Sequence, residues 1–392
     1  MRSILKTSVA VLVASVAAGA TVQAEDGPIK IGVVTPLSGT YTGIGQQVRW
    51  GLELAANEVN KAGGILGRQV KLIFEDSEAN PAVAVQRAER LIESENVDFL
   101  TGTVNSGATL AVGQLAERSG KLLATTVSFA DSITGDQCSP NVFRVNARAG
   151  QQSAALANWV AQKKPNAKVY YLGPDYEMGR STVAAFKRAV EELGAKGVGE
   201  TFAPLGNNDY STYFGQLRAA QPNVLYTSVA GNDTVRLLTQ MQNFGLLKDL
   251  LVVGASGTVT SQNIGAIGSA ADNFGTGVGY SAKIDTPENK KFVADFRKAY
   301  NADPDLYGAD SYGLIYLYKA AAEKAGSVGT DAVRKGMEDL KWNTPQGEKT
   351  MRAADHQAVQ PMYVVQIHGG SFDIVDKIPG EKAIGPDDCK RF

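Results

Sequence analysis

The amino-acid sequence predicts an α/β protein of two doubly wound parallel-sheet lobes with a cleft between them. Short strands that are apolar throughout alternate with helices, which is typical of parallel sheets covered by helices on both faces. This alternation begins with a strand at 29–34 and starts again with a strand at 168–172. The chain has 392 residues, enough for two domains that each bury a core of their own.

Residues 1–24 have the pattern of a signal peptide. Arg2 and Lys6 precede an apolar run at about 9–20, which is too short to span a membrane. Small residues then lead to a cleavage site after Ala24. We therefore expect a soluble protein that is exported to the periplasm.

The first half of the chain contains start and stop signals for helices. Apolar residues recur at helical spacing after the first strand, until the pair Gly63-Gly64 ends that helix. Asn80 and Pro81 then provide an N-cap and a first-turn proline for the second helix. The strands expected in this half are 29–34, 70–75, 97–102 and 122–125, and a third helix lies between the last two.

The second half repeats the pattern and ends differently. A helix with an apolar face follows the first strand of this half and ends at Gly194. The segment 362–375 predicts a β-hairpin that turns at Gly369-Gly370. The other strands expected in this half are 168–172, 224–229 and 250–256.

Charge and motif content argue against several classes of function. The 39 Lys and Arg nearly balance the 40 Asp and Glu, which argues against nucleic acid or an anionic membrane surface as a partner. The two histidines, His356 and His368, have no partner at metal-ligand spacing, so we expect no metal site and no cofactor. No G-x-S-x-G elbow, Walker loop or G-x-G-x-x-G fingerprint occurs. We expect no catalytic residues and no enzyme, with paired surface carboxylates for glycoside hydrolysis as the remaining alternative.

The two cysteines, Cys138 and Cys389, are expected to form one disulfide bond. Exported proteins reach an oxidising compartment, and neither cysteine belongs to a CxxC motif. Such a bond would close a loop of roughly 250 residues. The alternative is two separate thiols.

Three polar stretches follow predicted strands, at the position where open α/β sheets bind ligands. They are VNSGAT at 104–109, TVSFAD at 126–131 and GPDYEMG at 173–179. With two lobes facing each other, we expect the site in the cleft between them. In the first stretch, the turn before the third helix offers a hydroxyl and free backbone N–H groups, which suit a carboxylate, although the same residues would also suit a simple helix cap.

Several stretches together resemble the branched-chain amino acid (Leu/Ile/Val)-binding protein family, the type I periplasmic solute-binding proteins of ABC importers. The most specific piece is GGILGR at 63–68, with the strand that follows it and Asp76. The resemblance covers essentially the whole chain after the signal peptide. The matching stretches are 31–92, 105–109, 175–194, 209–226 and 303–322.

The resemblance implies two lobes that close on a ligand and are joined by three chain crossings. It places lobe one at 27–146 plus 275–354 and lobe two at 147–274 plus 355–392. Similar receptors often tie a loop like DQCSPNVFR (136–144) to the chain terminus, which agrees with the expected disulfide. The same likeness implies a monomer that works with ABC permease and ATPase subunits at the inner membrane.

The resemblance also carries a carboxylate site over to the turn before the third helix. There Ser106, helped by Asn105 and Gly107, would bind the acid group of a ligand through its hydroxyl and main-chain N–H groups. Ser128 and Ala130 match a second contact region, which usually offers main-chain carbonyl and hydroxyl groups. The alternatives are a helix cap at the first position and an ordinary loop at the second.

Aromatic residues match the walls of the family's cleft. Tyr176 matches an aromatic residue of lobe two that closes over the ligand, with a packed surface tyrosine as the alternative. Tyr41 and Ile44 fall where the family's entrance loop meets the ligand. Together with Phe129, the two tyrosines would suit stacking on an aromatic ring, although such residues also line aliphatic pockets.

Two positions depart from the family's amino acid receptors. Those receptors place an acid after the matching strand, where it pairs with the ligand ammonium, and here Ser256 occupies that position. They also often have a tyrosine where this chain has Ala230-Gly231. A buried ammonium needs a counter-charge, for which Asp131 and Asp233 are candidates that would serve equally well as surface caps.

We therefore expect the periplasmic substrate-binding component of an ABC import system for amino acids (Leu/Ile/Val-like) or a related small carboxylate. Because Ser256 replaces the expected acid, aromatic acids, amides or urea are the alternative ligands. A ligand-sensing receptor module without transport is the alternative from a different class of function.

Overall fold

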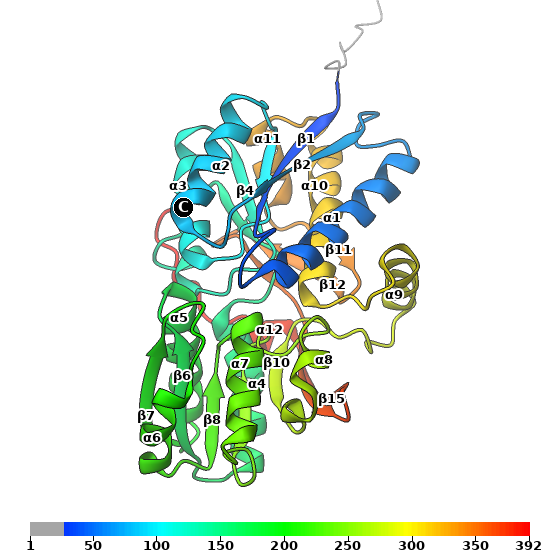
Figure 1. The fold of residues 1–392 in the computed structure, drawn as a ribbon. Coiled ribbons are helices and arrows are strands. Elements are labelled where there is room, and N and C mark those ends of the chain that lie inside the picture. The colour runs from blue at the N-terminus through cyan, green and yellow to red at the C-terminus, as the bar shows by residue number, and fades with distance from the viewer. Residues whose placement is uncertain (1–26) are drawn as a thin grey trace, which may run out of the picture.

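Two twisted sheets flanked by helices form two lobes, one above the other in Figure 1. The structure is a computed structural model that describes residues 27–392, so the predicted signal peptide at 1–24 lies outside the described residues. Both sheets consist mainly of parallel strands with helices on either side, which confirms the predicted α/β fold of two doubly wound lobes. Within 27–392, no helix is both long and apolar enough to cross a membrane.

Lobe one contains an eight-stranded sheet in the order β11-β12-β13-β5-β4-β3-β1-β2. The first five strands and β13 pair in parallel, whereas β11 and β12 add an antiparallel edge. The strands are β1 (Ile29–Thr35), β2 (Val70–Asp76), β3 (Phe99–Thr101), β4 (Leu122–Thr125), β5 (Val142–Arg144), β11 (Lys341–Thr344), β12 (Gly347–Arg352) and β13 (Gln357–Val359). The helices are α1 (Thr42–Lys61), α2 (Pro81–Glu93), α3 (Ser106–Arg118), η1 (Asp131–Thr134), α9 (Pro287–Tyr300), α10 (Leu306–Ala325) and α11 (Thr330–Met337).

Lobe two contains a seven-stranded sheet in the order β15-β14-β10-β9-β8-β6-β7. Its last two strands form the predicted hairpin, which is confirmed with its turn at 369–370. The strands are β6 (Lys168–Pro174), β7 (Lys196–Ala203), β8 (Val224–Thr227), β9 (Leu251–Gly254), β10 (Gly275–Val278), β14 (Met362–His368) and β15 (Ser371–Ile378). The helices are α4 (Ala149–Lys163), α5 (Glu177–Glu191), α6 (Ser211–Ala220), α7 (Asn232–Asn243), α8 (Ile264–Ile267), η2 (Gly268–Ala271) and α12 (Gly380–Ala383).

Local sequence signals set the starts of the helices. The side chain of Asn80 accepts hydrogen bonds from the backbone N–H groups of Ala82 and Val83, and Pro81 occupies the first turn. Helix α2 therefore begins where the N-cap and proline pattern predicted it.

The sheet topology moves two of the predicted lobe boundaries. Strand β10 belongs to the second sheet, because Thr276 pairs with Val365 of β14, so the boundary at 275 is too early. Strand β13 belongs to the first sheet, because Gln357 pairs with Arg144 of β5, so the boundary at 355 is also too early. The chain crosses between the lobes after β5, after β10 and after β13. Weak or short strands are assigned to a sheet by the partners they find, and sequence pattern alone does not show those partners.

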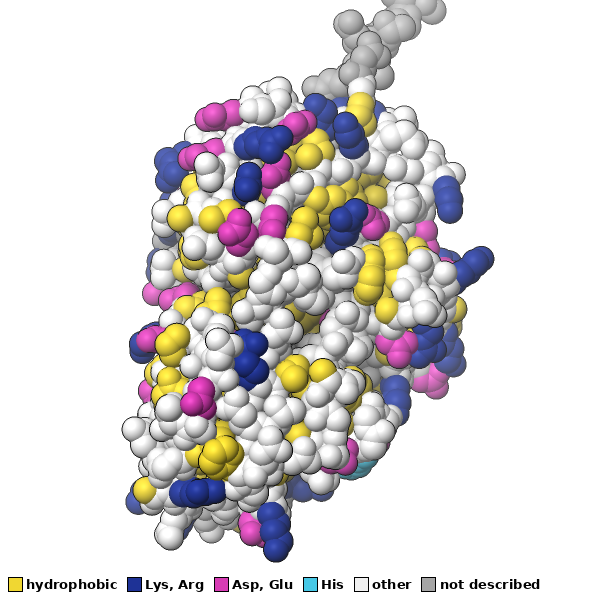
Figure 2. Space-filling model, viewed as in Figure 1, with side chains coloured by type: hydrophobic (Ala, Val, Ile, Leu, Met, Phe, Trp, Pro, Cys, Tyr) yellow, Lys and Arg dark blue, Asp and Glu magenta, His cyan; other side chains and the backbone are white. Residues whose placement is uncertain are grey.

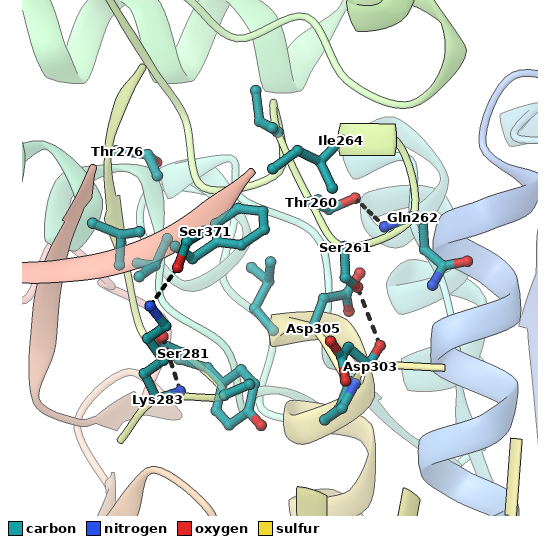
Figure 3. Close-up of a pocket in the computed structure, with 18 of the residues that line it drawn as sticks. Thr260, Ser261, Gln262, Ile264, Thr276, Ser281, Lys283, Asp303, Asp305 and Ser371 are labelled. Atoms are coloured by element: carbon teal, nitrogen blue, oxygen red, sulfur yellow. Dashed lines mark hydrogen bonds between the residues drawn. The ribbon is translucent and has the colours of Figure 1, made fainter. Parts of the chain in front are cut away.

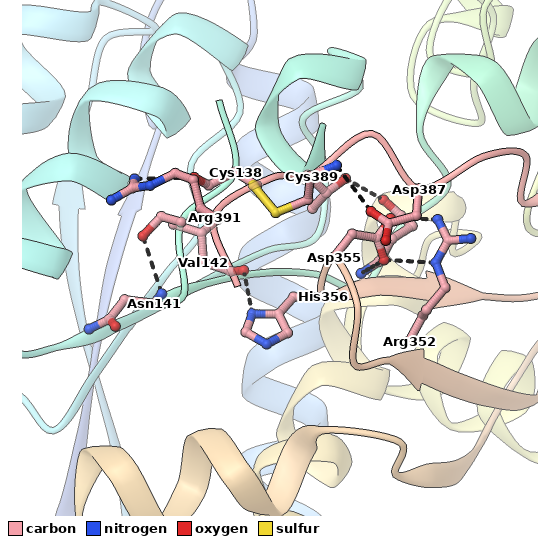
Figure 4. The surroundings of a disulfide bond; sticks show 12 residues. Cys138, Asn141, Val142, Arg352, Asp355, His356, Asp387, Cys389 and Arg391 are labelled. Atoms are coloured by element: carbon pink, nitrogen blue, oxygen red, sulfur yellow. Dashed lines mark hydrogen bonds and ion pairs between the residues drawn. A yellow bond between two sulfur atoms is a disulfide. The ribbon is translucent and has the colours of Figure 1, made fainter. Parts of the chain in front are cut away.

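The expected disulfide is confirmed between Cys138 and Cys389, with 5.7 Å between the Cα atoms (Figure 4). The residues after α12 thus lie against lobe one, although the prediction placed 355–392 in lobe two. An ion pair between Arg391 and Glu117 of α3, at 2.7 Å, also holds the C-terminal residues against lobe one. The ring of Phe392 lies 4.4 Å from the ring of His356, and burial lowers the pKa of His356 to about 4.

Charged side chains of both signs are interspersed on the face of the molecule shown in Figure 2. Neither sign forms a continuous patch there, which agrees with the nearly equal numbers of acidic and basic residues.

Candidate ligand-binding site

Four aromatic rings meet where the two lobes face each other. Tyr41 precedes α1, Phe129 follows β4 and Tyr307 lies in the first turn of α10, all in lobe one, whereas Tyr176 precedes α5 in lobe two. They line one small chamber, of which the remaining lining residues are Ile44, Val104, Val127, Met178 and Ala230. The predicted grouping of Tyr41, Ile44, Phe129 and Tyr176 at the cleft is therefore present in the structure.

The aromatic chamber is closed by direct contacts between the lobes. The hydroxyl oxygens of Tyr41 in lobe one and Tyr176 in lobe two lie 2.9 Å apart in a hydrogen bond. Within lobe one, the rings of Phe129 and Tyr307 stack with their centroids 6.2 Å apart. The free volume left between these side chains is about 10 Å³, close to that of one water molecule. Burial raises the pKa of both tyrosines, so their hydroxyls remain neutral hydrogen-bonding groups. A ligand would enter only when the lobes part.

Two glycines of lobe two allow this close approach. A Cβ atom on Gly231, whose φ is +62°, would lie 2.5 Å from the carbonyl oxygen of Thr40 in lobe one. A Cβ atom on Gly257 would lie 1.9 Å from the hydroxyl oxygen of Tyr307. Any larger residue at either position would clash with lobe one in this closed arrangement.

The residues at the start of α3 were predicted either to cap the helix or to bind a carboxylate, and the structure shows which of them is the cap. Asn105 is the N-cap, since its Oδ1 accepts from the N–H of Ala108 at 3.1 Å and its Nδ2 donates to the carbonyl of Ala79 at 3.1 Å. Ser106 is the first residue of the helix, is fully buried, and its Oγ accepts from the N–H of Ala130 at 3.3 Å. The cap is therefore Asn105, and Ser106 instead joins the α3 terminus to the segment after β4.

The segment 128–130 borders the aromatic chamber through Phe129. The hydroxyl of Ser128 forms hydrogen bonds within lobe one, to the hydroxyl of Thr109 at 2.5 Å and to the carbonyl of Val104 at 3.0 Å. Neither Ser128 nor Ala130 lines the chamber, whereas Phe129 between them does. Of residues 128–130, which were predicted to contact the ligand, only the side chain of Phe129 therefore lines the chamber.

Neither candidate counter-charge lines the aromatic chamber. Asp233 is buried in lobe two, where it accepts from the N–H of Gly206 at 2.7 Å and pairs with Arg236. Asp131 accepts from the N–H of Gly150 at 2.9 Å and lies 3.9 Å from Arg148. Within 27–392, no acidic side chain lines this chamber.

Ser256 lines a second and larger space between the lobes, a groove of about 500 Å³ (Figure 3). Its floor includes Thr276 of β10, and its lobe-one wall is the turn before α10. The Oγ of Ser261 donates to the carbonyl of Asp303 at 3.2 Å, which links the two walls. Asp305 caps α10 through the N–H of Tyr307 at 2.9 Å, and burial raises its pKa to about 7. Sequence reasoning did not indicate this groove, because its walls come from four separate stretches of the chain, 256–264, 276–283, 297–306 and 365–372.

Of the four aromatic rings of the chamber, Tyr307 is the one that sequence reasoning missed. It lies within DPDLYGAD (303–310), a stretch that resembles the family, yet nothing in its local pattern separates it from the buried residues of α10. Only the packing of α10 against the interlobe surface shows its role. In the part of the chain that the structure describes, no group of three His, Cys, Asp or Glu side chains is arranged to hold a metal ion.

Two α/β lobes that close on an aromatic interface define the molecule as a two-lobed binding protein. The chain belongs to the periplasmic binding protein family, whose model matches residues 28–371. Proteins of this family bind solutes for ABC transporters and are not enzymes.

Individual relatives differ in what they bind. Leu/Ile/Val-binding protein homolog 3 from Brucella melitensis is 29% identical over 336 residues, which are 84% of this chain and 89% of that protein. A solute-binding protein of an R. palustris ABC transporter, solved in complex with benzoate, is 25% identical with a TM-score of 0.84, covering 90% of this chain and 96% of its own. A leucine-binding protein from Thermotoga maritima shares the fold with a TM-score of 0.82 at 23% identity, covering 90% of this chain and 99% of its own.

Proposed function

We propose that this protein is the substrate-binding component of an ABC import system and that its ligand is a small aromatic acid. The observation that carries this proposal is the aromatic chamber, whose walls contain four rings and no acidic side chain. A ligand ammonium buried there would cost several kcal/mol without a counter-charge. An aromatic acid has no ammonium group to balance, and its ring would gain stacking contacts with the chamber walls.

The acid group would bind at the start of α3. The helix N-terminus presents free N–H groups and a partial positive charge, and the hydroxyl of Ser106 lies beside it. The N–H of Ala130 donates to the hydroxyl of Ser106 at 3.3 Å, and both groups would turn to a carboxylate bound there. The ring would then extend from this end toward Tyr41 and Tyr176.

A Leu/Ile/Val-like amino acid is the second candidate. The similarity to the Brucella melitensis Leu/Ile/Val-binding protein homolog favours it. The hydroxyls of Tyr41 and Tyr176 would then have to accept hydrogen bonds from the ammonium group, without a carboxylate to balance its charge.

Closure would couple binding to transport. A ligand that contacts both lobes favours the closed form by its difference in affinity for the two forms, and a permease would recognise that form. In this proposal residues 1–24 direct export to the periplasm, and the protein acts there as a monomer.

A thermal-shift screen tests the ligand class, because a bound ligand raises the apparent melting temperature by mass action. The probes are benzoate, cyclohexanecarboxylate, L-phenylalanine and L-leucine, each confirmed by calorimetric titration. We expect benzoate to raise the melting temperature most. Cyclohexanecarboxylate keeps the charge and lacks the aromatic ring, so it isolates the role of stacking. A shift with leucine and none with benzoate would contradict the aromatic-acid proposal and favour the second candidate.

A further inference from the structure

Arg144 is a fully buried cation without a carboxylate partner. It is the last residue of β5, and every hydrogen bond of its guanidinium goes to a neutral oxygen atom. These acceptors are Gln357 Oε1 at 2.6 Å, the carbonyls of Ala130 at 2.5 Å and Ser128 at 3.4 Å, and the hydroxyl of Thr134. Within 27–392, no acidic oxygen lies within 4.0 Å of the Arg144 guanidinium.

The acids near Arg144 are already engaged with other cations. Asp355 pairs with Arg352 at 2.5 Å, and Asp131 lies 3.9 Å from the buried Arg148. The other buried cation of this region, Lys349, has its own partner in Asp310 at 2.5 Å. Arg144 is thus the buried charge that these pairs leave unbalanced.

An unbalanced buried charge destabilises a protein by several kcal/mol. Burial lowers the pKa of Arg144 to about 9, so the group is still a cation at neutral pH. An anion that binds nearby would offset this cost by providing the negative charge that the protein itself does not place beside Arg144.

The position of Arg144 indicates where that anion would bind. The peptide groups of Ala130 connect the two sites, because the carbonyl accepts from Arg144 and the N–H donates to Ser106 at the start of α3. Phe129, one residue earlier, forms a wall of the aromatic chamber. The guanidinium therefore holds the backbone on both sides of Phe129, in the segment that also contacts Ser106 of the proposed carboxylate site.

We propose that Arg144 is the counter-charge of the ligand's carboxylate and makes the site select a monoanion over a neutral ligand of the same shape. The inference rests on the proposed function and adds the origin of charge selectivity. Arg144 acts through the segment 128–130 and does not touch the ligand, so it is a specificity-determining positioning residue.

A purely structural role is the competing explanation. Arg144 joins β5 to Gln357 of β13, and the chain crosses between the lobes directly after both strands. Its loss would then weaken acids and neutral ligands equally. The ratio of affinities for an acid and its amide separates the two roles.

The experiment is calorimetric titration of benzoate and benzamide, and of L-leucine and L-leucinamide, into wild-type protein, Arg144→Gln and Arg144→Lys. We expect the acid-to-amide affinity ratio to fall about tenfold, or about 1.4 kcal/mol, in Arg144→Gln. Amide binding should change little, and Arg144→Lys should retain most of the acid preference because it keeps the charge. An unchanged ratio in Arg144→Gln overturns the inference while leaving the proposed function intact. A wild-type protein that binds neither acid overturns both.

A second pair of variants tests the same charge without removing Arg144. Thr134→Asp places a carboxylate beside the guanidinium, and Thr134→Asn is the matched control of the same shape without charge. We expect the acid-to-amide ratio to fall about tenfold in the aspartate variant alone. Equal ratios in the two Thr134 variants overturn the inference even if Arg144→Gln does not fold.

Discussion

Replacing Gly257 with alanine should weaken ligand binding by opposing closure of the lobes. The added Cβ would lie 1.9 Å from the hydroxyl oxygen of Tyr307 and 3.2 Å from the ring of Phe129. Gly257 belongs to lobe two and both rings belong to lobe one, so the clash exists only in the closed form. Overpacking of this kind costs about 1–3 kcal/mol, which corresponds to a loss of affinity of roughly fivefold to 150-fold.

Two measurements check this prediction. Calorimetric titration with benzoate gives the loss of affinity, and small-angle X-ray scattering should show a larger radius of gyration for the liganded variant than for the liganded wild type. Gly265→Ala is the control, because nothing lies within 4 Å of its added Cβ. Adding Tyr307→Phe to Gly257→Ala removes the clashing oxygen and should restore part of the affinity. If Gly257→Ala binds and closes like the wild type, these residues do not meet in the working closed form.

Three further variants test other parts of the structure. Ser106→Ala should lose a charge-assisted hydrogen bond to the ligand and about 1.5–3 kcal/mol of acid-binding free energy, measured by calorimetry. Replacing Cys138 and Cys389 together with serine should lower the free energy of unfolding in urea by up to about 5 kcal/mol, because the 251-residue separation is no longer bridged. Asp305 has a folded pKa of about 7 against an ordinary value of 3.8, so the native state keeps a proton that the unfolded state loses. The unfolding free energy should therefore fall as pH rises from about 4 to 7, and Asp305→Asn, which still caps α10, should reduce that slope in urea titrations.

Each of these variants has a control. Ser119→Ala, at the exposed far end of α3, should leave binding unchanged, and equal losses at Ser106 and Ser119 would refute the carboxylate site. Reduction of wild-type protein should reproduce the instability of the double serine variant. An identical pH slope in wild type and Asp305→Asn would show that Asp305 is not the group that titrates.

Sequence reasoning was strongest where a strand is long or apolar and where a helix has a cap. Strands β1, β6 and β8 lie where apolar runs predicted them, and Asn80 begins α2. Strands β11 to β13, at one end of the first sheet, were not predicted, because KWNT, GEKTMR and QAV are short or rich in polar residues. Such strands form because a partner edge is available, and that information is not local.

The site shows the same limit. The family resemblance brought Tyr41 and Tyr176 together although they are 135 residues apart, and the structure places them in contact. It gave no indication of Tyr307, and it assigned Ser256 to the ligand site when that residue lines the neighbouring groove. Arginine is almost never fully buried, so nothing in the sequence VFR indicated that Arg144 would be a cation inside the protein.

The disulfide bond gives the hinge a fourth covalent tether. Three polypeptide crossings join the lobes, and the tail beyond α12 returns from lobe two to end at Cys138 of lobe one. About five residues connect Ala383 of lobe two to Cys389, which is bonded to lobe one. The extended length of this short linker therefore limits how far the lobes can separate. Reduction of the disulfide would remove this connection, so we expect the lobes to open wider in a reducing compartment than in an oxidising one.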